Sequence, residues 1–389
     1  MTAATLALEN GTTFEGISVG ADGETEGEVV FNTSLTGYQE VLTDPSYSGQ
    51  IVTMTAPQIG NYGVTAEDCE SRQTSVAGFV VREASPVTSN WRAEGSFRDY
   101  LRQNGIVAIA EIDTRQLTRI LRGVGVMRGV IGTGNVSAQA LVDKAKHSAK
   151  MEGADWVKAV TCDAPFVWNA QTAPQGAGAP AGPADFIVAP SRLASAAAGG
   201  GARTIAAYDL GMKWNILRRF TNHGLNVQVF PATTPAEEVL ATKPAGIFFS
   251  NGPGDPAALD YVGRNAKVAA ESGVPVFGIC LGHQVLALGL GGKTFKMKFG
   301  HRGTNHPVKH LETGQVEITS QNHGFAVDPD SLPKDVEVTH LNLYDGTVEG
   351  LKHRERPVFC VQYHPEAAPG PHDADYLFGR FLDAIDGRK

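Results

Sequence analysis

The second half of the chain alternates short apolar runs with helix-like segments, and this alternation constrains the fold more than any other feature. The apolar runs are TIAAYDLG, LNVQVFPA, AGIFFSNGPG and VPVFGICLG, and helices are expected near 213–223, 236–242, 257–272 and 283–289. Parallel strands need long crossover connections, which are usually helices. We therefore predict an α/β domain with a mostly parallel sheet over residues 203–389.

The first half has a different pattern, because strand-like runs outnumber helical ones. The strand-like runs are GEVVFNTS, QIVTMTA, VAGFVVREA and GIVAIAEI, and DTRQLTRILRG is typical of a helix. We predict a β-rich α+β domain over residues 1–160. Residues 161–202 are predicted to be a linker or loop-rich segment, because 170–202 are mostly Ala, Gly, Pro and Ser and bury too little apolar surface to offset the entropy of ordering.

Composition excludes several classes of partner. The formal net charge is -8 and no basic patch occurs, so we expect no binding to nucleic acid. Neither a signal-like N-terminus nor a run of about 18 apolar residues is present, which predicts a cytoplasmic protein with no membrane partner. The four cysteines lack CxxC spacing, so neither a disulfide framework nor a zinc site is expected.

Cys280 lies between the strand-like VPVFGI and the helix-like HQVLALG. Together with Gly278 and Gly282 it forms the pattern G-x-C-x-G, the thiol form of the nucleophile elbow. The glycines allow strand and helix backbones to pass close together, and the turn presents the thiol at the carboxyl edge of the sheet. A helix N-terminus lowers the pKa of a nearby thiol and places the Leu281 N–H where an oxyanion forms. Although most cysteines are buried filler, this pattern favours a nucleophile.

A nucleophilic thiol needs a base, and His364 in VFCVQYHPEAA is the candidate. Pro365 disfavours helix at the preceding residue, so the segment should be extended, with His364 and Glu366 on one side. A carboxylate beside an imidazole fixes its tautomer, as in an acid–base–nucleophile triad. We predict Cys280, His364 and Glu366 to be catalytic. We expect His283 and His323 to be structural or binding residues.

Two further patterns suggest a cofactor less strongly. ALGLGGKT at 287–294 differs from a P-loop because Ala287 stands in place of the first glycine, and it follows a helix rather than a strand. His301, His306 and His310 are spaced closely enough to consider a metal, but a metal site there is the minor alternative. We therefore predict no cofactor and no metal in this chain.

Four strings in order, SNGPGDP, FGICLGHQ, QNHGFAV and HPEA, resemble the signature set of class I glutamine amidotransferase domains, over about residues 203 to 385. Each string is moderately specific, and the ordered set is highly specific. The strings GEVVFNTSLTGYQEVLTDPSYSGQIV, IGNYG, AIAEIDTRQLTR, AYDLGMKWNILR and KFGHRGTNHPV resemble the small, glutamine-hydrolysing subunits of carbamoyl-phosphate synthases. The resemblance covers nearly the whole chain except the segment around 170–202.

The resemblance implies that L-glutamine is hydrolysed to glutamate and ammonia through a thioester on Cys280, with His364 moving the proton. It implies that the backbone N–H groups of Gly252 and Leu281 bind the oxyanion. The glutamine contacts that it implies are Ser46, Gly252, Gly254, Leu281, Gln284, Asn322, Gly324 and Phe325. Ammonia would pass to a large carbamoyl-phosphate synthase subunit in a heterodimer, and that subunit would carry ATP and its metal ions. The product would serve arginine and pyrimidine synthesis.

Two other functions stay open at this level. One is a different amidotransferase of the same class, serving GMP, anthranilate or CTP synthesis, and the N-terminal string FNTSLTGYQE argues against it. The other is a non-catalytic subunit that keeps a dead glutaminase fold. The joint presence of Cys280, His364 and Glu366 argues against that alternative.

Overall fold

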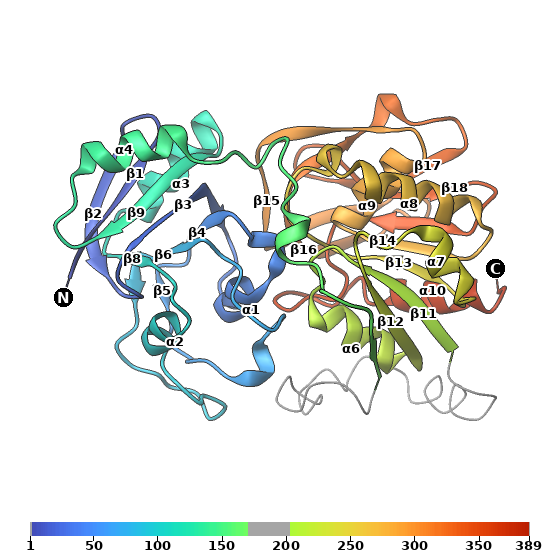
Figure 1. The fold of residues 1–389 in the computed structure, drawn as a ribbon, viewed down its shortest axis with the longest axis horizontal. Helices are drawn as coiled ribbons and strands as arrows, with labels where there is room; N and C mark the ends of the chain where they lie inside the picture. The colour runs from blue at the N-terminus through green and yellow to red at the C-terminus, as the bar shows by residue number, and fades with distance from the viewer. Residues whose placement is uncertain (1, 170–202, 389) are drawn as a thin grey trace.

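The computed structural model describes residues 2–169 and 203–388, which form two lobes lying side by side (Figure 1). Residues 170–202 of the predicted linker lie outside the described residues, so that part of the prediction is not addressed. The domain boundaries themselves stay a prediction. Among the described residues, no helix combines the length and the apolar character needed to cross a lipid bilayer.

The N-terminal lobe is built on a closed β-barrel. Its strands in spatial order are β1 (Ala3–Leu8), β2 (Thr13–Ser18), β8 (Ala108–Ala110), β6 (Gly78–Val80), β4 (Gln50–Met54), β3 (Glu24–Asn32) and β9 (Met127–Thr133). Strands β3, β4, β6 and β8 run parallel, and the other pairs are antiparallel. The remaining elements of this lobe are α1 (Tyr38–Thr43), β5 (Gln58–Ile59), β7 (Glu83–Ala84), α2 (Phe97–Gln103), α3 (Thr114–Val124) and α4 (Ala138–His147).

Successive residues of the barrel strands pack into two different cores. Val30 and Val52 belong to a cluster that includes side chains of α1 and α2, whereas Val29 and Ile51 belong to a cluster that includes α3. Because neighbours along a strand point to opposite faces, strands covered on both faces are apolar at every position. This explains why consecutive positions of these strands, such as Val29 and Val30 or Ile51 and Val52, are apolar.

The C-terminal lobe contains a ten-stranded sheet, counted over the described residues. Its parallel part is formed by β12 (Leu225–Pro231), β11 (Arg203–Asp209), β13 (Ile247–Phe249), β14 (Val276–Ile279) and β19 (Val358–Val361). One face packs against α7 (Ala236–Ala241), α8 (Asp260–Glu271) and α9 (Leu281–Gly289), and the other packs against α6 (Trp214–Asn222) and α10 (Tyr376–Ile385). The α/β alternation expected from the sequence is confirmed.

The sheet continues beyond the parallel strands, which sequence analysis did not anticipate. Next to β19 lie the antiparallel strands β18 (Val348–His353), β17 (Val336–Asn342), β15 (Lys293–His310) and β16 (Val316–Asp328). At the opposite edge, β10 (Phe166–Trp168) pairs with β12, so these three residues of the predicted linker belong to the sheet. Strand β15 also reaches the other lobe, since the Val126 N–H donates to Lys298 O and the Thr33 N–H donates to Arg302 O.

Candidate active site

Cys280 occupies the turn between β14 and α9 in a conformation that few residues adopt, with φ 54° and ψ -104°. Positive φ at a residue other than glycine is strained and is common at functional sites. A Cβ at Gly282 would lie 2.0 Å from the Phe249 carbonyl oxygen, and one at Gly278 would lie 2.9 Å from backbone atoms of Gly282. The crowding that the G-x-C-x-G pattern predicts is therefore present in the structure.

His364 lies three residues after the end of β19, and its backbone N–H donates to Ser320 O at 2.9 Å. The segment is not extended as predicted, because the Ala367 N–H donates to His364 O at 3.1 Å and closes a turn over residues 365–366. The His364 Nδ1 lies 2.7 Å from Glu366 Oε1, and both side chains are buried. Burial lowers the pKa of His364, but the Glu366 carboxylate and the Cys280 side chain outweigh burial and raise that pKa to about 10. The ring nitrogen Nε2 makes no hydrogen bond of good geometry among the described residues. The imidazolium is therefore held between the carboxylate and the thiol.

Glu366 has a second partner, Lys213, whose Nζ lies 3.0 Å from the same Oε1 atom. Burial raises the pKa of Glu366, but Lys213 and His364 outweigh it and lower that pKa to about 2. Sequence reasoning assigned no role to Lys213, although AYDLGMKWNILR contributed to the family resemblance. No local pattern indicates that a residue 153 positions before Glu366 contacts it.

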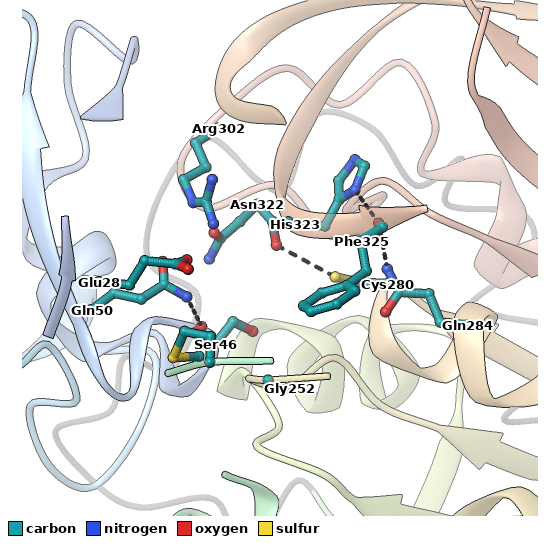
Figure 2. Close-up of a pocket in the computed structure, with 13 residues that line it drawn as sticks. Glu28, Ser46, Gln50, Gly252, Cys280, Gln284, Arg302, Asn322, His323 and Phe325 are labelled. Carbon is teal, nitrogen blue, oxygen red and sulfur yellow. Dashed lines mark hydrogen bonds between the residues drawn. The ribbon is translucent and has the colours of Figure 1, made fainter. Parts of the chain in front are cut away.

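A pocket of about 380 Å³ opens beside Cys280 and is formed by both lobes (Figure 2). Seven of the eight predicted glutamine contacts line it: Ser46, Gly252, Gly254, Gln284, Asn322, Gly324 and Phe325. The remaining one, Leu281, does not line the pocket and follows Cys280 at the start of α9. The thiol group lies 3.5 Å from Asn322 O at the inner side of this pocket.

Asp44 organises the part of the pocket that the N-terminal lobe contributes. One carboxylate oxygen accepts the Ser46 N–H at 2.9 Å, and the other accepts the Asn322 side-chain amide at 2.9 Å. Asn251 donates to the Ser46 hydroxyl at 2.9 Å. The Ser46 oxygen is thus an acceptor for the protein, which leaves its O–H free to donate to a ligand.

Gln284 plays a different part from the other predicted contacts. Its amide nitrogen donates to Phe325 O at 2.8 Å and to Gln362 Oε1 at 3.0 Å. These bonds tie α9 to β16 and to the segment that leads to His364. The Gln284 side chain therefore positions the pocket wall, in addition to lining the pocket.

Four pocket-lining residues were not found from the sequence: Glu28, Gln50, Met151 and Arg302. His323, which was expected to be a structural or binding residue, also lines the pocket. Glu28 and Gln50 are partners on the parallel strands β3 and β4. The signal available in the sequence was a polar residue inside an otherwise apolar strand. Burial lowers the pKa of the Arg302 guanidinium, whose Nη1 donates to Phe299 O at 2.7 Å. The pocket thus contains charges of both signs.

The predicted oxyanion donors, the Gly252 and Leu281 N–H groups, are not used elsewhere. Among the described residues neither donates a hydrogen bond to a protein acceptor, whereas the neighbouring Gly282 N–H donates to Ser250 O at 2.9 Å. The loop after β13 and the start of α9 are in contact, because a Cβ at Gly252 would lie 2.8 Å from a Leu281 side-chain carbon. Their role as oxyanion donors stays a prediction.

A second cavity, of about 290 Å³, is next to the first, and the two share Asn322 in their walls. The second cavity is lined by His364 and Lys213 together with the acidic side chains of Glu40 and Asp44. Burial raises the pKa of Glu40 to about 8. Ionisable side chains therefore line this cavity together with apolar ones such as Val41 and Pro369.

The histidines considered as a metal site are only partly brought together. His301 lies near His323 and Glu349, with one possible ligand atom of each within 4.8 Å of the others, but neither His306 nor His310 is in this group. The His301 ring lies 2.9 Å from Asp345 and 3.5 Å from Glu349. Burial lowers the pKa of His301, but these two carboxylates outweigh it and raise that pKa to about 9. A protonated imidazole therefore fills the place between the carboxylates that a cation would take.

Comparison with known proteins gives matches to two families along this chain. The model of the class-I glutamine amidotransferase family matches residues 206–384, and that of the carbamoyl-phosphate synthase small chain, CPSase domain, matches residues 6–131. The carbamoyl phosphate synthase small chain of Syntrophotalea carbinolica is 51% identical over 98% of both chains. The small chain of Polynucleobacter necessarius is 52% identical, and the match covers 98% of this chain and 96% of the relative. The small chain of Rhodopirellula baltica is 51% identical, and the match covers 99% of this chain and 96% of the relative.

Proposed function

Because the chain belongs to the family of carbamoyl phosphate synthase small chains, we propose that it hydrolyses glutamine and supplies the ammonia to a large subunit that makes carbamoyl phosphate. The observation that carries this proposal is the nucleophile elbow. Cys280 faces a pocket lined by both lobes, with a buried His364–Glu366 pair behind it. The match over residues 6–131 favours this function over other amidotransferases of the same class.

The chemistry follows from the positions of these groups. The Cys280 thiolate attacks the side-chain amide carbon of glutamine, and the oxyanion that forms is held by the Gly252 and Leu281 N–H groups. The His364 imidazolium gives its proton to the leaving nitrogen, so that ammonia departs and a thioester remains. Neutral His364 then removes a proton from water, which attacks the thioester and releases glutamate and the thiolate. The Glu366 carboxylate fixes the imidazole tautomer throughout.

The charges of the pocket suit the backbone of a free amino acid. Arg302 offers a guanidinium, and Glu28, which also pairs with Lys296 at 2.5 Å, offers a carboxylate. A zwitterion presents a carboxylate and an ammonium group, which these side chains complement. The free Ser46 O–H adds a hydrogen-bond donor on the same side. We infer that the pocket binds the substrate by its α-substituents and directs its side-chain amide toward Cys280.

Ammonia must reach the partner without entering water, where it would be protonated and diluted. The second cavity, which His364 lines, supports a route by which ammonia leaves the triad. We propose that ATP and its metal ions bind to the large subunit and not to this chain, since ALGLGGKT lacks the first glycine of a P-loop. We also propose that the chain is cytoplasmic and that carbamoyl phosphate serves arginine and pyrimidine synthesis.

The test is carbamoyl phosphate synthesis by the complex that contains Cys280→Ser. We expect synthesis from glutamine to be abolished and synthesis from added ammonium to be retained. Cys162→Ser, which removes another buried thiol, is the matched control and should leave both activities intact. Gel filtration checks that the complex is intact. Loss of both activities in an intact complex would mean that this chain does more than release ammonia.

A further inference from the structure

Lys213 is a buried ammonium group next to the triad. Lys213 is 3% exposed, and its Nζ donates to Glu366 Oε1 at 3.0 Å and to Ala367 O at 2.6 Å. Burying an ammonium ion costs several kcal/mol unless hydrogen bonds and an opposite charge compensate it. Both compensating groups come from the catalytic segment that follows β19. Lys213 and this segment are therefore tied to each other.

The Glu366 carboxylate depends on this contact. Its Oε1 atom accepts from both His364 Nδ1 and Lys213 Nζ, whereas Oε2 has no hydrogen-bond partner among the described residues. A carboxylate buried with one unsatisfied oxygen is strongly destabilised relative to the neutral acid. Without Lys213, burial would favour a proton on Glu366. A neutral Glu366 would no longer stabilise the imidazolium of His364.

The start of α6 holds Lys213 in place and also holds the backbone of Glu366. Asn215, the second residue of α6, donates its side-chain amide to Glu366 O at 2.5 Å. The Lys213 N–H donates to Asn251 Oδ1 at 3.1 Å, next to the loop after β13. Glu366 is thus fixed at both its side chain and its carbonyl by neighbouring residues of one helix.

Glu70 of the N-terminal lobe fixes the start of α6 in turn. Its carbonyl oxygen accepts the Trp214 N–H at 2.7 Å, and its carboxylate accepts the Asn215 N–H at 2.9 Å and lies 3.3 Å from Arg218. A carboxylate at a helix N-terminus satisfies free N–H groups and interacts favourably with the helix dipole. Contacts therefore run from the N-terminal lobe through α6 to Glu366 and His364.

We propose that Lys213 is a positioning residue of the proposed glutamine hydrolysis. Lys213 keeps Glu366 ionised and oriented toward His364, and Glu70 of the N-terminal lobe holds Lys213 in position. This inference rests on the proposed function. The contact between the two lobes would then help to arrange the triad, in addition to forming the pocket. A Lys213 that merely stabilised the contact between lobes would leave the protonation of the triad unchanged.

The test uses Lys213→Met, which keeps an unbranched side chain only one atom shorter and removes its charge. Glutaminase kcat/KM and the rate of Cys280 alkylation by iodoacetamide are measured from pH 5 to pH 9 on the full chain. We expect kcat/KM at pH 7 to fall on the order of 10- to 100-fold, below the ~10² to 10⁴ that a general base contributes. We also expect the acid limb of both profiles to move to higher pH by about one unit or more, because Glu366 then titrates near neutral pH.

The matched control is Lys352→Met, which removes a lysine that pairs with Glu312 and Glu337 on the outer part of the sheet. This variant should leave both pH profiles in place. Lys213→Arg keeps the charge but has a different head group. This variant should have a lower kcat, and the acid limb of its pH profiles should lie at the same pH as in the unchanged protein. An unshifted acid limb in a folded Lys213→Met protein would overturn the proposal.

A double-variant cycle decides the matter even if Lys213→Met does not fold. If Lys213 acts through Glu366, Lys213→Arg should lower kcat several-fold in the unchanged chain and have little further effect in the Glu366→Gln background. An equal loss in both backgrounds would overturn the proposal. Failure of the proposed function itself looks different, because the unchanged protein would then release no ammonia from glutamine.

Discussion

Gly282→Ala tests the elbow most directly, because the added methyl group meets backbone and not a movable side chain. The new Cβ would lie 2.0 Å from the Phe249 carbonyl oxygen and 2.7 Å from its carbon, roughly 1.4 Å short of the 3.4 Å at which contact becomes ordinary. Neither atom can rotate away, so β13 and α9 must separate. Overpacking costs about 1 to 3 kcal/mol, and a clash between two backbones should reach the upper end of that range.

Moving α9 away from β13 would also disturb catalysis. The Gly282 N–H donates to Ser250 O at 2.9 Å, and Leu281, a predicted oxyanion donor, precedes it. Removing one oxyanion donor typically costs ~10² to 10³ in kcat. We therefore expect Gly282→Ala to lower both the free energy of unfolding and glutamine turnover.

The assays are urea denaturation and glutaminase turnover, with Gly263→Ala as the matched control. Gly263 lies inside α8, and a Cβ there would meet nothing within 4 Å. Replacing a helical glycine by alanine should stabilise the protein by about 0.5 to 1 kcal/mol and leave turnover unchanged. Equal stability and turnover in Gly282→Ala and the unchanged protein would refute the close approach of the two backbones.

Four further predictions concern single groups. A glutamine-like electrophile should label Cys280 before Cys69, Cys162 or Cys360, because burial raises the pKa of each of the other three thiols. Peptide mapping that finds another cysteine labelled first, with activity lost in step, would contradict the elbow assignment. His364→Asn should keep glutamine binding and lower turnover by about 10² to 10⁴, and an active variant would point to another base such as His323. Glu366→Gln should lower turnover less than His364→Asn does. It should reduce the free energy of unfolding by about 3 to 5 kcal/mol, because Lys213 is left buried without its ion-pair partner. A chemical denaturation midpoint equal to that of the unchanged protein would refute this. The pKa of His301 is raised from 6.5 to about 9, so its ion pairs add stability that is full below pH 6.5 and is lost as the pH rises through 9. The stability difference between the unchanged protein and His301→Gln should therefore shrink over that range, and a constant difference would contradict a charged His301.

Features that depend on neighbouring residues could be predicted from the sequence. The elbow is one, because Gly278, Cys280 and Gly282 lie in a single strand–turn–helix unit whose geometry follows from five consecutive positions. The contact of His364 with Glu366 was also predicted, although the extended segment expected to produce it is wrong: residues 365–366 form a turn, and this turn brings Glu366 back to the imidazole. The alternation of strands and helices likewise predicted the parallel sheet, because parallel strands that follow one another in the chain need a crossover helix between them.

The sequence by itself therefore determined the parallel sheet, the turn that exposes the thiol and the local His364–Glu366 pair. Only the tertiary structure decided what surrounds them. Lys213 meets Glu366 across 153 positions, and Asp44 meets Asn322 across 278. Both are polar side chains buried where two elements meet, and no periodicity encodes which partner satisfies them. The antiparallel strands β15 and β16 were missed for the same reason, because their many buried polar residues obscure the apolar alternation by which a strand is recognised.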